Sequence, residues 1–256
     1  MSNSTIVVVA ALAQEFSALR RHLQNESVSE EDGVRSYCGE LGGKPVALVV
    51  SGVGAQNAAR ATRLAIKRHS PGLVISLGYA GGLTPEAGPG RVILPALVKA
   101  HDASDTSLNG ALGLTPDAGL LKVVRSAASQ IRHSPLGGTI LTVPAIVATR
   151  EAKKALHANT GAVAVDMESA AIGAACRDSA IRVVFMRCIT DGVNDEIPAT
   201  KEISAAFRGR IRILPFLAGL ARRPAAAVAI WRLFWRAHRA SKTLSQLVQA
   251  FCQILP

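Results

Sequence analysis

Acidic residues follow three apolar, strand-like runs of this sequence, and their placement suggests chemistry on a glycosidic bond. They are Glu15 after residues 6–11, Asp166 and Glu168 after residues 162–165, and Asp191 after residues 183–189. One carboxylic acid can protonate a leaving group while a second carboxylate activates the nucleophile at a sugar anomeric carbon. Since buried charges need compensation, several carboxylates at one apolar edge would be costly without a task.

Strand-like and helix-like runs alternate over the first 200 residues, which predicts an α/β fold with one central sheet flanked by helices. In such a sheet, ligands bind outside the carboxyl ends of parallel strands, where the acids are expected. The predicted strands are 6–11, 34–38, 46–50, 73–77, 92–98, 139–142, 162–165 and 183–189. The predicted helices are 15–23, 55–69, 117–132, 150–158 and the Ala-rich run that begins near Glu168.

The changeover from strand to helix at Asp166-Met167-Glu168 has two interpretations. A carboxylate in the first turn of a helix is stabilised by unpaired backbone N–H groups and by the helix dipole, so Glu168 could simply begin the helix. Alternatively, Glu168 faces a ligand at the edge of the sheet. The stretch alone leaves both interpretations open.

Two glycine-containing turns, Ser51–Gly54 and Gly78–Gly82, follow predicted strands. Gly52-Val53-Gly54 lacks the third glycine of a dinucleotide fingerprint and is not in the first βαβ unit, so tight turns and close packing explain it equally well. No Walker motif occurs, and the six histidines and four cysteines show no metal-ligand spacing, which predicts no metal site.

The composition predicts a folded protein of the cytoplasm. The chain has 256 residues, 49% of them hydrophobic and 18% charged, which is far from a disordered composition. Scattered cysteines indicate a reducing compartment. The first residues lack the basic region of a signal peptide, and no apolar run has the length of a membrane span.

Four motifs in the same order resemble the purine nucleoside phosphorylase and nucleosidase superfamily, and the nucleosidases of methylthioadenosine and S-adenosylhomocysteine in particular. They are Ser51-Gly52-Val53-Gly54, Ser76-Leu77-Gly78-Tyr79-Ala80-Gly81-Gly82-Leu83, Val165-Asp166-Met167-Glu168-Ser169-Ala170-Ala171 and Arg187-Cys188-Ile189-Thr190-Asp191. The resemblance implies a three-layer nucleoside phosphorylase-like α/β fold with a mixed central sheet. It also implies a homodimer or larger assembly.

By position, the resemblance implies that Asp191 protonates the purine at N7 and that Glu15 activates water. Glu168 would hold the ribose hydroxyls and Met167 would pack under the sugar. An anionic site with a general acid at N7 suits a ribosyl oxocarbenium transition state. Asp166 is expected to shape the turn that presents its two neighbours.

The resemblance further implies that Gly78, Tyr79, Ile146 and Val147 contact substrate. Tyr79 departs from the methylthioadenosine nucleosidases, which have a small Ser there, so it could reshape the pocket or offer a stacking face. The Gly-Asp-Pro-x-Arg phosphate loop of the hexameric phosphorylases is missing, and Glu15 stands about where their arginine would be. A carboxylate repels phosphate, which favours water as nucleophile, with phosphate a co-substrate only in a phosphorylase and no cofactor in either case.

The C-terminal region differs from the rest and predicts a division into a catalytic domain, 1–205, and a helical extension, 206–256. From residue 203 onward there are nine basic residues and no acid, out of a net charge of +11. A helix predicted at 225–253 has Arg232, Arg236 and Arg239 on one side and Ile230, Phe234, Leu244 and Leu247 on the other, with Trp231 and Trp235 beside them. This pattern suits a membrane surface or packing on the domain itself. Nucleic acid is disfavoured because the aromatic residues lie with the apolar ones.

The variant Val-Asp-Met-Glu-Ser, with Leu214-Pro215-Phe216, resembles the hopanoid-associated branch of the superfamily, which releases adenine from adenosylhopane. The sequence therefore predicts hydrolysis of a 5′-substituted adenosine, peripherally at the inner face of the cytoplasmic membrane. The alternatives are phosphorolysis of the same bond, a methylthioadenosine/S-adenosylhomocysteine nucleosidase, and a non-catalytic module that binds nucleosides or nucleic acid.

Overall fold

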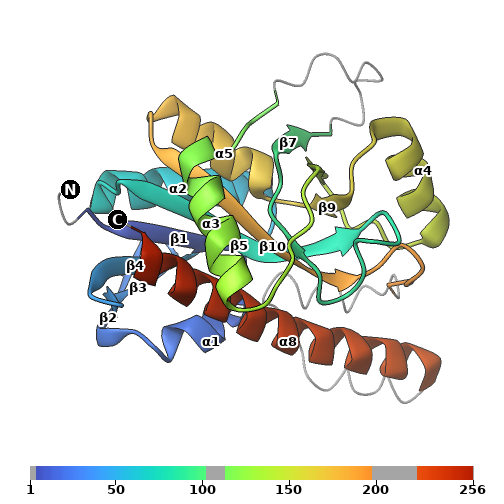
Figure 1. Ribbon diagram of the computed structural model, residues 1–256, viewed down its shortest axis with the longest axis horizontal. Coiled ribbons are helices and arrows are strands. Elements are labelled where there is room, and N and C mark those ends of the chain that lie inside the picture. Colours follow the sequence, from blue (N-terminus) through green and yellow to red (C-terminus); the bar gives the residue numbers. More distant parts are fainter. Residues whose placement is uncertain (1–3, 102–112, 198–223, 256) are drawn as a thin grey trace.

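Helices cover both faces of a central sheet in the computed structural model, which describes residues 4–101, 113–197 and 224–255 (Figure 1). The alternating side chains of the buried strand β1 (Ile6–Ala10) show how the layers form. Val8 lies in one core cluster with residues of α1, α3 and α8, whereas Val7 and Val9 lie in another with residues of α2 and α5. These helices span Ser17–Arg20, Ala118–Gln130, Pro224–Ile254, Ala55–His69 and Ser169–Asp178 in that order. The predicted three-layer α/β fold is confirmed.

The sheet is mixed, as expected, and it brings several strand ends to one edge. β1 pairs in parallel with β4 and β5, and β5 pairs in parallel with β10. The predicted strands 34–38 and 46–50 lie in β3 and β4, which form an antiparallel hairpin, while β9 runs antiparallel to the end of β5. The order is β2-β3-β4-β1-β5-β9-β8-β7, and β10 pairs with β5 and β6 outside this path. The strands are β2 (Gln24–Glu31), β3 (Val34–Leu41), β4 (Lys44–Val50), β5 (Leu73–Gly82), β6 (Val92–Ile93), β7 (Leu97–Ala100), β8 (Thr139–Thr142), β9 (Ala164–Asp166) and β10 (Arg182–Asp191).

The segment after β1 differs from the prediction. In place of one helix at 15–23, a 3₁₀ turn, η1 (Ala13–Phe16), leads into the single turn of α1, and β2 begins at Gln24. The eight residues of β2 are largely exposed, so apolar alternation could not reveal this strand. It forms because it pairs with β3 at the edge of the sheet.

Two further boundaries also differ. The predicted turn Gly78–Gly82 is the second half of β5, held by its pairing with β10. The predicted strand 92–98 is split into β6 and β7, because Pro95 has no N–H for a sheet ladder. Helices α2, α3 and α4 (Arg150–Thr160) match their predicted positions to within two residues.

The C-terminal helix α8 has two distinct halves. Leu244, Leu247 and Phe251 have no exposed surface and belong to the main core cluster. By contrast, Trp231 and Phe234 are each 62% exposed. The last half of the helix therefore packs on the domain. No helix within the described ranges is long and apolar enough to cross a membrane. The predicted boundary at 205/206 and the motif at 214–216 lie outside the described residues.

Candidate active site

A pocket lies at the edge where the parallel strands end, and the acids predicted from the sequence line it. Seven of the eight predicted site residues are among its lining residues: Glu15, Tyr79, Ile146, Val147, Met167, Glu168 and Asp191. The eighth, Gly78, lies directly against the Glu15 carboxylate. Glu15 and Asp191 converge because β1, β5 and β10 are parallel neighbours. Met167 and Glu168 reach the same edge from β9, which pairs antiparallel with the end of β5.

Glu15 is held by main-chain N–H groups. The turn η1 places the side chain so that Leu12 N donates to Oε2 and Tyr79 N donates to Oε1, each at 2.9 Å. The residue is only 5% exposed, and this burial raises the pKa of Glu15 although the two N–H groups act in the opposite direction. A Cβ on Gly78 would lie 2.9 Å from Oε1, so glycine leaves the space that the carboxylate occupies. The carboxylate is thus desolvated, oriented and suited to act as a base.

Glu168 lies where β9 gives way to α5, and it reaches across to the turn after β4. Its Oε1 accepts a hydrogen bond from Gly54 N at 2.7 Å. Gly54 has φ +95°, a conformation that favours glycine and aims this N–H at the carboxylate. Burial, reinforced by the nearby Asp166 carboxylate, raises the pKa of Glu168 to about 7. Glu168 is the N-cap residue of α5, but its side chain makes no capping hydrogen bond, so the first-turn interpretation does not describe its role.

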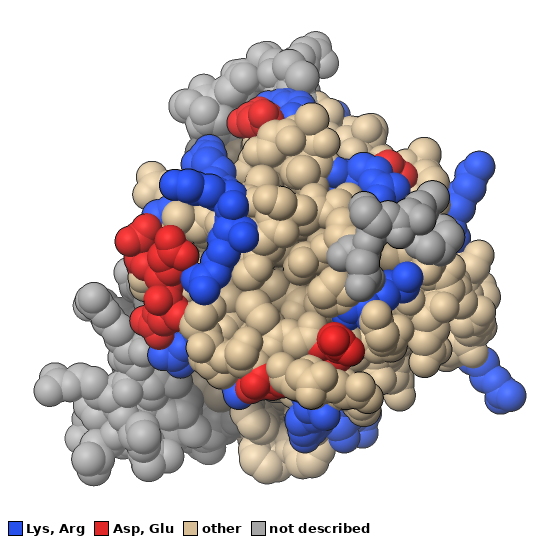
Figure 2. All heavy atoms as spheres, turned by 90° about the vertical axis from the view of Figure 1, so that its left-hand side faces the viewer, with Lys and Arg blue, Asp and Glu red and all other residues tan. Residues whose placement is uncertain are grey.

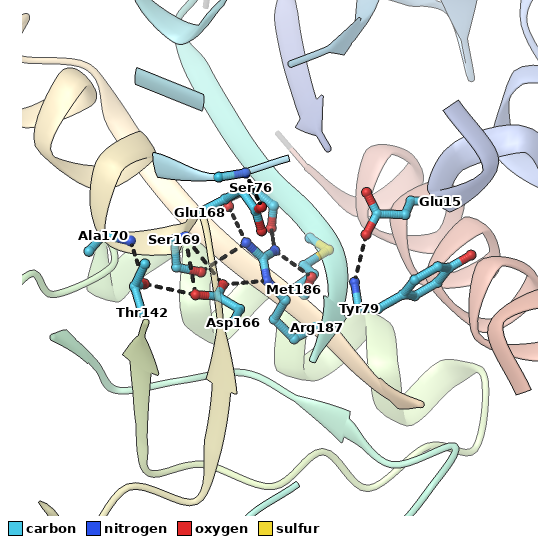
Figure 3. A network of polar contacts seen from close by, with 11 residues as sticks. Glu15, Ser76, Tyr79, Thr142, Asp166, Glu168, Ser169, Ala170, Met186 and Arg187 are labelled. Carbon is cyan, nitrogen blue, oxygen red and sulfur yellow. Dashed lines mark hydrogen bonds and ion pairs between the residues drawn. The ribbon is translucent and has the colours of Figure 1, made fainter. Parts of the chain in front are cut away.

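Asp166 and Arg187 form a buried ion pair beneath the pocket (Figure 3). Arg187 Nε donates to Asp166 Oδ2 at 2.8 Å, and its other nitrogens donate to Ser76, Met186 and Ser169. Asp166 also accepts hydrogen bonds from the Thr142 hydroxyl and Ser169 N. This network fixes the turn that carries Met167 and Glu168. Arg187 is part of one of the four motifs, but nothing in the sequence indicated that it pairs with Asp166.

Asp191 ends β10, and a lysine that the sequence analysis missed lies behind it. Lys153 Nζ is 2.6 Å from Asp191 Oδ2, while Thr190 Oγ1 donates to Oδ1 at 3.0 Å. Asp191 is 6% exposed and Lys153 is 1% exposed. Lys153 is the buried residue of α4, a helix whose other charged residues face solvent. The sequence did contain one signal of this buried lysine, because Lys153 lies on the apolar side of an amphipathic helix.

The remaining walls of the pocket are apolar. Ile146 and Val147, predicted to lie near the base, line it together with Leu233 of α8. The ring of Tyr79 packs against the main core cluster, and its hydroxyl donates to Gln14 O at 3.4 Å. Leu233 was missed because the sequence places α8 at the far end of the chain.

Four carboxylates therefore line one partly apolar pocket. Asp166 is paired with Arg187, and the other three are each in a different electrostatic environment. Glu15 has backbone partners, Glu168 is weakly acidic, and Asp191 has a lysine partner. Among the described residues, no three His, Cys, Asp or Glu side chains cluster in a way that could hold a metal ion. The arrangement can hold a polar ligand and move protons at two separate points.

The sequence pattern of the phosphorylase superfamily matches residues 5–214. The chain belongs to this superfamily. It is therefore an enzyme of the nucleosidase and phosphorylase group, as the motifs predicted.

One curated protein resembles this chain in sequence, and two solved structures share its fold. The 5′-methylthioadenosine/S-adenosylhomocysteine nucleosidase of Psychromonas ingrahamii is 32% identical over 196 residues, which cover 73% of this chain and 85% of that protein. The crystal structure of the corresponding nucleosidase from Neisseria meningitidis, in complex with methylthio-immucillin-A, has a TM-score of 0.79 at 23% identity and covers 98% of this chain and 100% of its own. Futalosine hydrolase of Helicobacter pylori has the same TM-score, 0.79, at 14% identity, with coverage of 98% and 100%.

Proposed function

We propose that the protein hydrolyses the N-glycosidic bond of a 5′-substituted adenosine and releases adenine. The observation that carries this is that Glu15, Glu168 and Asp191 line one pocket in three different environments. Groups whose surroundings differ in this way can take separate roles in one reaction. The superfamily membership and the nucleosidase from Psychromonas ingrahamii support the reaction class.

In this mechanism, Glu168 accepts hydrogen bonds from the ribose hydroxyls and Met167 packs against the sugar. Asp191 gives a proton to N7 of the purine, and Lys153 Nζ, 2.6 Å from Asp191 Oδ2, supplies that proton. The bond from C1′ to N9 then breaks, and its electron pair stays on a neutral base. Glu15 takes a proton from water as the water oxygen bonds to C1′. The proton that Glu15 takes from water is exchanged through solvent after the products leave, which restores both Glu15 and Lys153. The carboxylates stabilise the positive charge that develops on the ribosyl ring.

Water is favoured over phosphate by the sign of the local charge. The Glu15 carboxylate would repel a phosphate anion, and Arg187, whose charge acts on Glu15, is already bonded to Asp166. Phosphorolysis at the same carbon remains the alternative reaction. A module that only binds nucleosides would release no base at all.

Product analysis with and without phosphate tests this reaction. The protein is incubated with 5′-methylthioadenosine and with adenosylhopane, and adenine and the sugar product are measured by mass spectrometry. Hydrolysis yields a free ribosyl sugar at a rate that phosphate does not change. A ribose 1-phosphate product, or release that requires phosphate, would show a phosphorylase instead. No adenine from either substrate would contradict the proposed function.

A lipid-bearing 5′ substituent is the substrate class that we propose, with adenosylhopane as the candidate. Trp231, Phe234 and Trp235 are 62%, 62% and 47% exposed, and the two tryptophan rings are in edge contact with centroids 5.7 Å apart. Leu233, between them in sequence, lines the pocket, so this aromatic patch adjoins the site. Arg232 is exposed beside the aromatic residues, which suits an anionic membrane surface.

Charge elsewhere supports a membrane contact that is local to α8. On the face in Figure 2, Lys and Arg side chains lie in separate groups, one of them directly beside a group of acidic side chains. Ion pairs of Arg35 with Glu30 and of Arg68 with Glu31 compensate further basic charge. Arg236, predicted to lie on the free basic side of the helix, instead pairs with Asp195.

Vesicle binding tests the aromatic patch, with substitutions in place of a deletion because the end of α8 is part of the core. The double variant Trp231→Ala/Phe234→Ala should bind phosphatidylglycerol-containing vesicles at least about tenfold more weakly than wild type. It should keep its activity on methylthioadenosine. Val28→Ala, at an exposed valine of β2, is the matched control. Equal vesicle binding by all three proteins would rule out the patch as a membrane contact. The predicted homodimer is tested separately by sedimentation.

A further inference from the structure

Lys153 occupies a position that packing alone does not explain. Its ammonium group is 1% exposed and has three acceptors: Asp191 Oδ2 at 2.6 Å, Gly192 O at 2.9 Å and Asp195 O at 3.0 Å. An ammonium group has three N–H donors, so every donor is used. Burying a lysine is expensive unless it is paired in this way.

The three acceptors belong to the short segment from Asp191 to Asp195, which begins with the proposed acid. Asp191 and Gly192 are neighbours, and Asp195 Oδ2 closes the turn by accepting from Gly192 N at 2.8 Å. Arg236 of α8 braces the same turn through Asp195 at 2.8 Å. The turn is thus held from two helices, α4 and α8. Of the two side chains that these helices contribute, Lys153 bonds to the Asp191 carboxylate, whereas Arg236 bonds to Asp195.

We propose that Lys153 is the positioning residue for Asp191: it fixes the carboxyl group that faces the purine and keeps a proton available next to it. Thr190 holds the second carboxyl oxygen at 3.0 Å, so the group has one preferred orientation. This role rests on the proposed function of Asp191. A purely structural lysine would join α4 to the turn without affecting how the leaving group departs.

Leaving groups of decreasing basicity separate the two roles. Adenine needs protonation to leave, whereas 4-nitrophenolate leaves as a stable anion. Lys153→Gln keeps donors for the carbonyls but removes the charge. We expect it to slow adenine release from methylthioadenosine by about 10²-fold in kcat, and to slow cleavage of the nitrophenyl riboside less than about threefold. 2-Fluoroadenine should fall between the two.

Two further variants complete the design. Lys153→Arg, which restores the cation, should recover adenine release to within about tenfold of wild type. Lys154→Met, at the exposed neighbour on α4, should match wild type with every leaving group. Urea unfolding of each variant, followed by circular dichroism, shows whether it is folded under assay conditions.

The outcomes are distinct. Equal losses of rate for all leaving groups in Lys153→Gln, or no loss for adenine, would overturn the positioning role while leaving the proposed reaction intact. If wild type itself releases no adenine from any 5′-substituted adenosine, the proposed function fails, and the role of Lys153 fails with it. A loss confined to basic leaving groups, with recovery in Lys153→Arg, supports the role.

Discussion

Two carboxylates at the pocket, Glu15 and Asp191, both lie close to a glycine of β5 but have hydrogen-bond donors of different charge. Each lies against a glycine of β5: a Cβ on Gly78 would be 2.9 Å from Glu15 Oε1, and one on Gly81 would be 3.1 Å from Asp191 Oδ2. Their partners differ, because Glu15 is held by neutral N–H groups and Asp191 by an ammonium. A desolvated carboxylate is a better base. Asp191 instead has the N–H donor of Lys153 at 2.6 Å, and this ammonium can replace a proton that Asp191 passes on. Under the proposed function, this difference places proton removal at Glu15 and proton delivery at Asp191.

Substitution of Asp191 should cause the largest loss of activity. Asp191→Asn removes the group that protonates N7, so kcat for adenine release should fall on the order of 10⁴-fold. Because it also leaves Lys153 buried without its counter-charge, the free energy of unfolding should fall by about 3 kcal/mol. Single-turnover assays and urea unfolding measure the two effects. Activity within tenfold of wild type in the folded variant would contradict the assignment.

The loss of activity on substitution of Glu15 should depend differently on the leaving group. Glu15→Gln removes the base, and we expect kcat to fall on the order of 10³-fold. Since water must attack whatever the leaving group is, the loss should be the same for adenine and 4-nitrophenolate. For Asp191→Asn, the loss should shrink with 4-nitrophenolate. If both variants show the same dependence on the leaving group, the contrast between Glu15 and Asp191 is wrong.

The glycine under Glu15 offers a way to displace one carboxylate without changing its chemistry. In Gly78→Ala, the added Cβ would displace Oε1 from its place beside Tyr79 N. A misplacement of about 1 Å costs about 10²-fold, so kcat should fall by up to that factor. Crystallography of the variant would locate the carboxylate. If the Glu15 carboxylate stays in place and the variant is fully active, the absence of a side chain at Gly78 is not needed for activity.

Glu168 should make substrate binding depend on pH. Because its pKa is raised to about 7, Glu168 is a carboxylate above that pH and becomes protonated below it. Binding to ribose hydroxyls should therefore weaken by about tenfold from pH 8 to pH 5.5. Calorimetry with methylthioadenosine and the inactive Asp191→Asn variant measures this, and adding Glu168→Gln should flatten the dependence. A profile that Glu168→Gln leaves unchanged would point to another group.

The smallest effect is expected at Tyr79. It holds Glu15 through its main-chain N–H, whereas its hydroxyl donates to Gln14 O at 3.4 Å. Tyr79→Phe keeps the N–H and the ring, so kcat/KM should change by less than about twofold. Steady-state kinetics on methylthioadenosine test this. A tenfold loss would mean that the hydroxyl contributes to the reaction.

Many of the helices and strands could be predicted from local sequence patterns. The apolar runs that became β1, β4, β8 and β10 and the periodic helices α2 and α3 were predicted, because burial of alternating or one-sided residues is a local pattern. The polar strand β2 could not be predicted, since its pairing with β3 gives it order and its side chains are exposed. The split at Pro95 was overlooked, although proline is a local signal for it.

The sequence by itself determined which residues could do the chemistry: three acids placed after strands, in the order that the superfamily shares. Only the tertiary structure decided their environments. Lys153 meets Asp191 from 38 residues away and Arg187 meets Asp166 from 21 residues away. Large apolar side chains occur in both halves of α8, yet Leu244 and Leu247 are buried whereas Trp231 and Phe234 are exposed. Burial and pairing depend on contacts between distant segments, and these set the pKa and orientation of each acid.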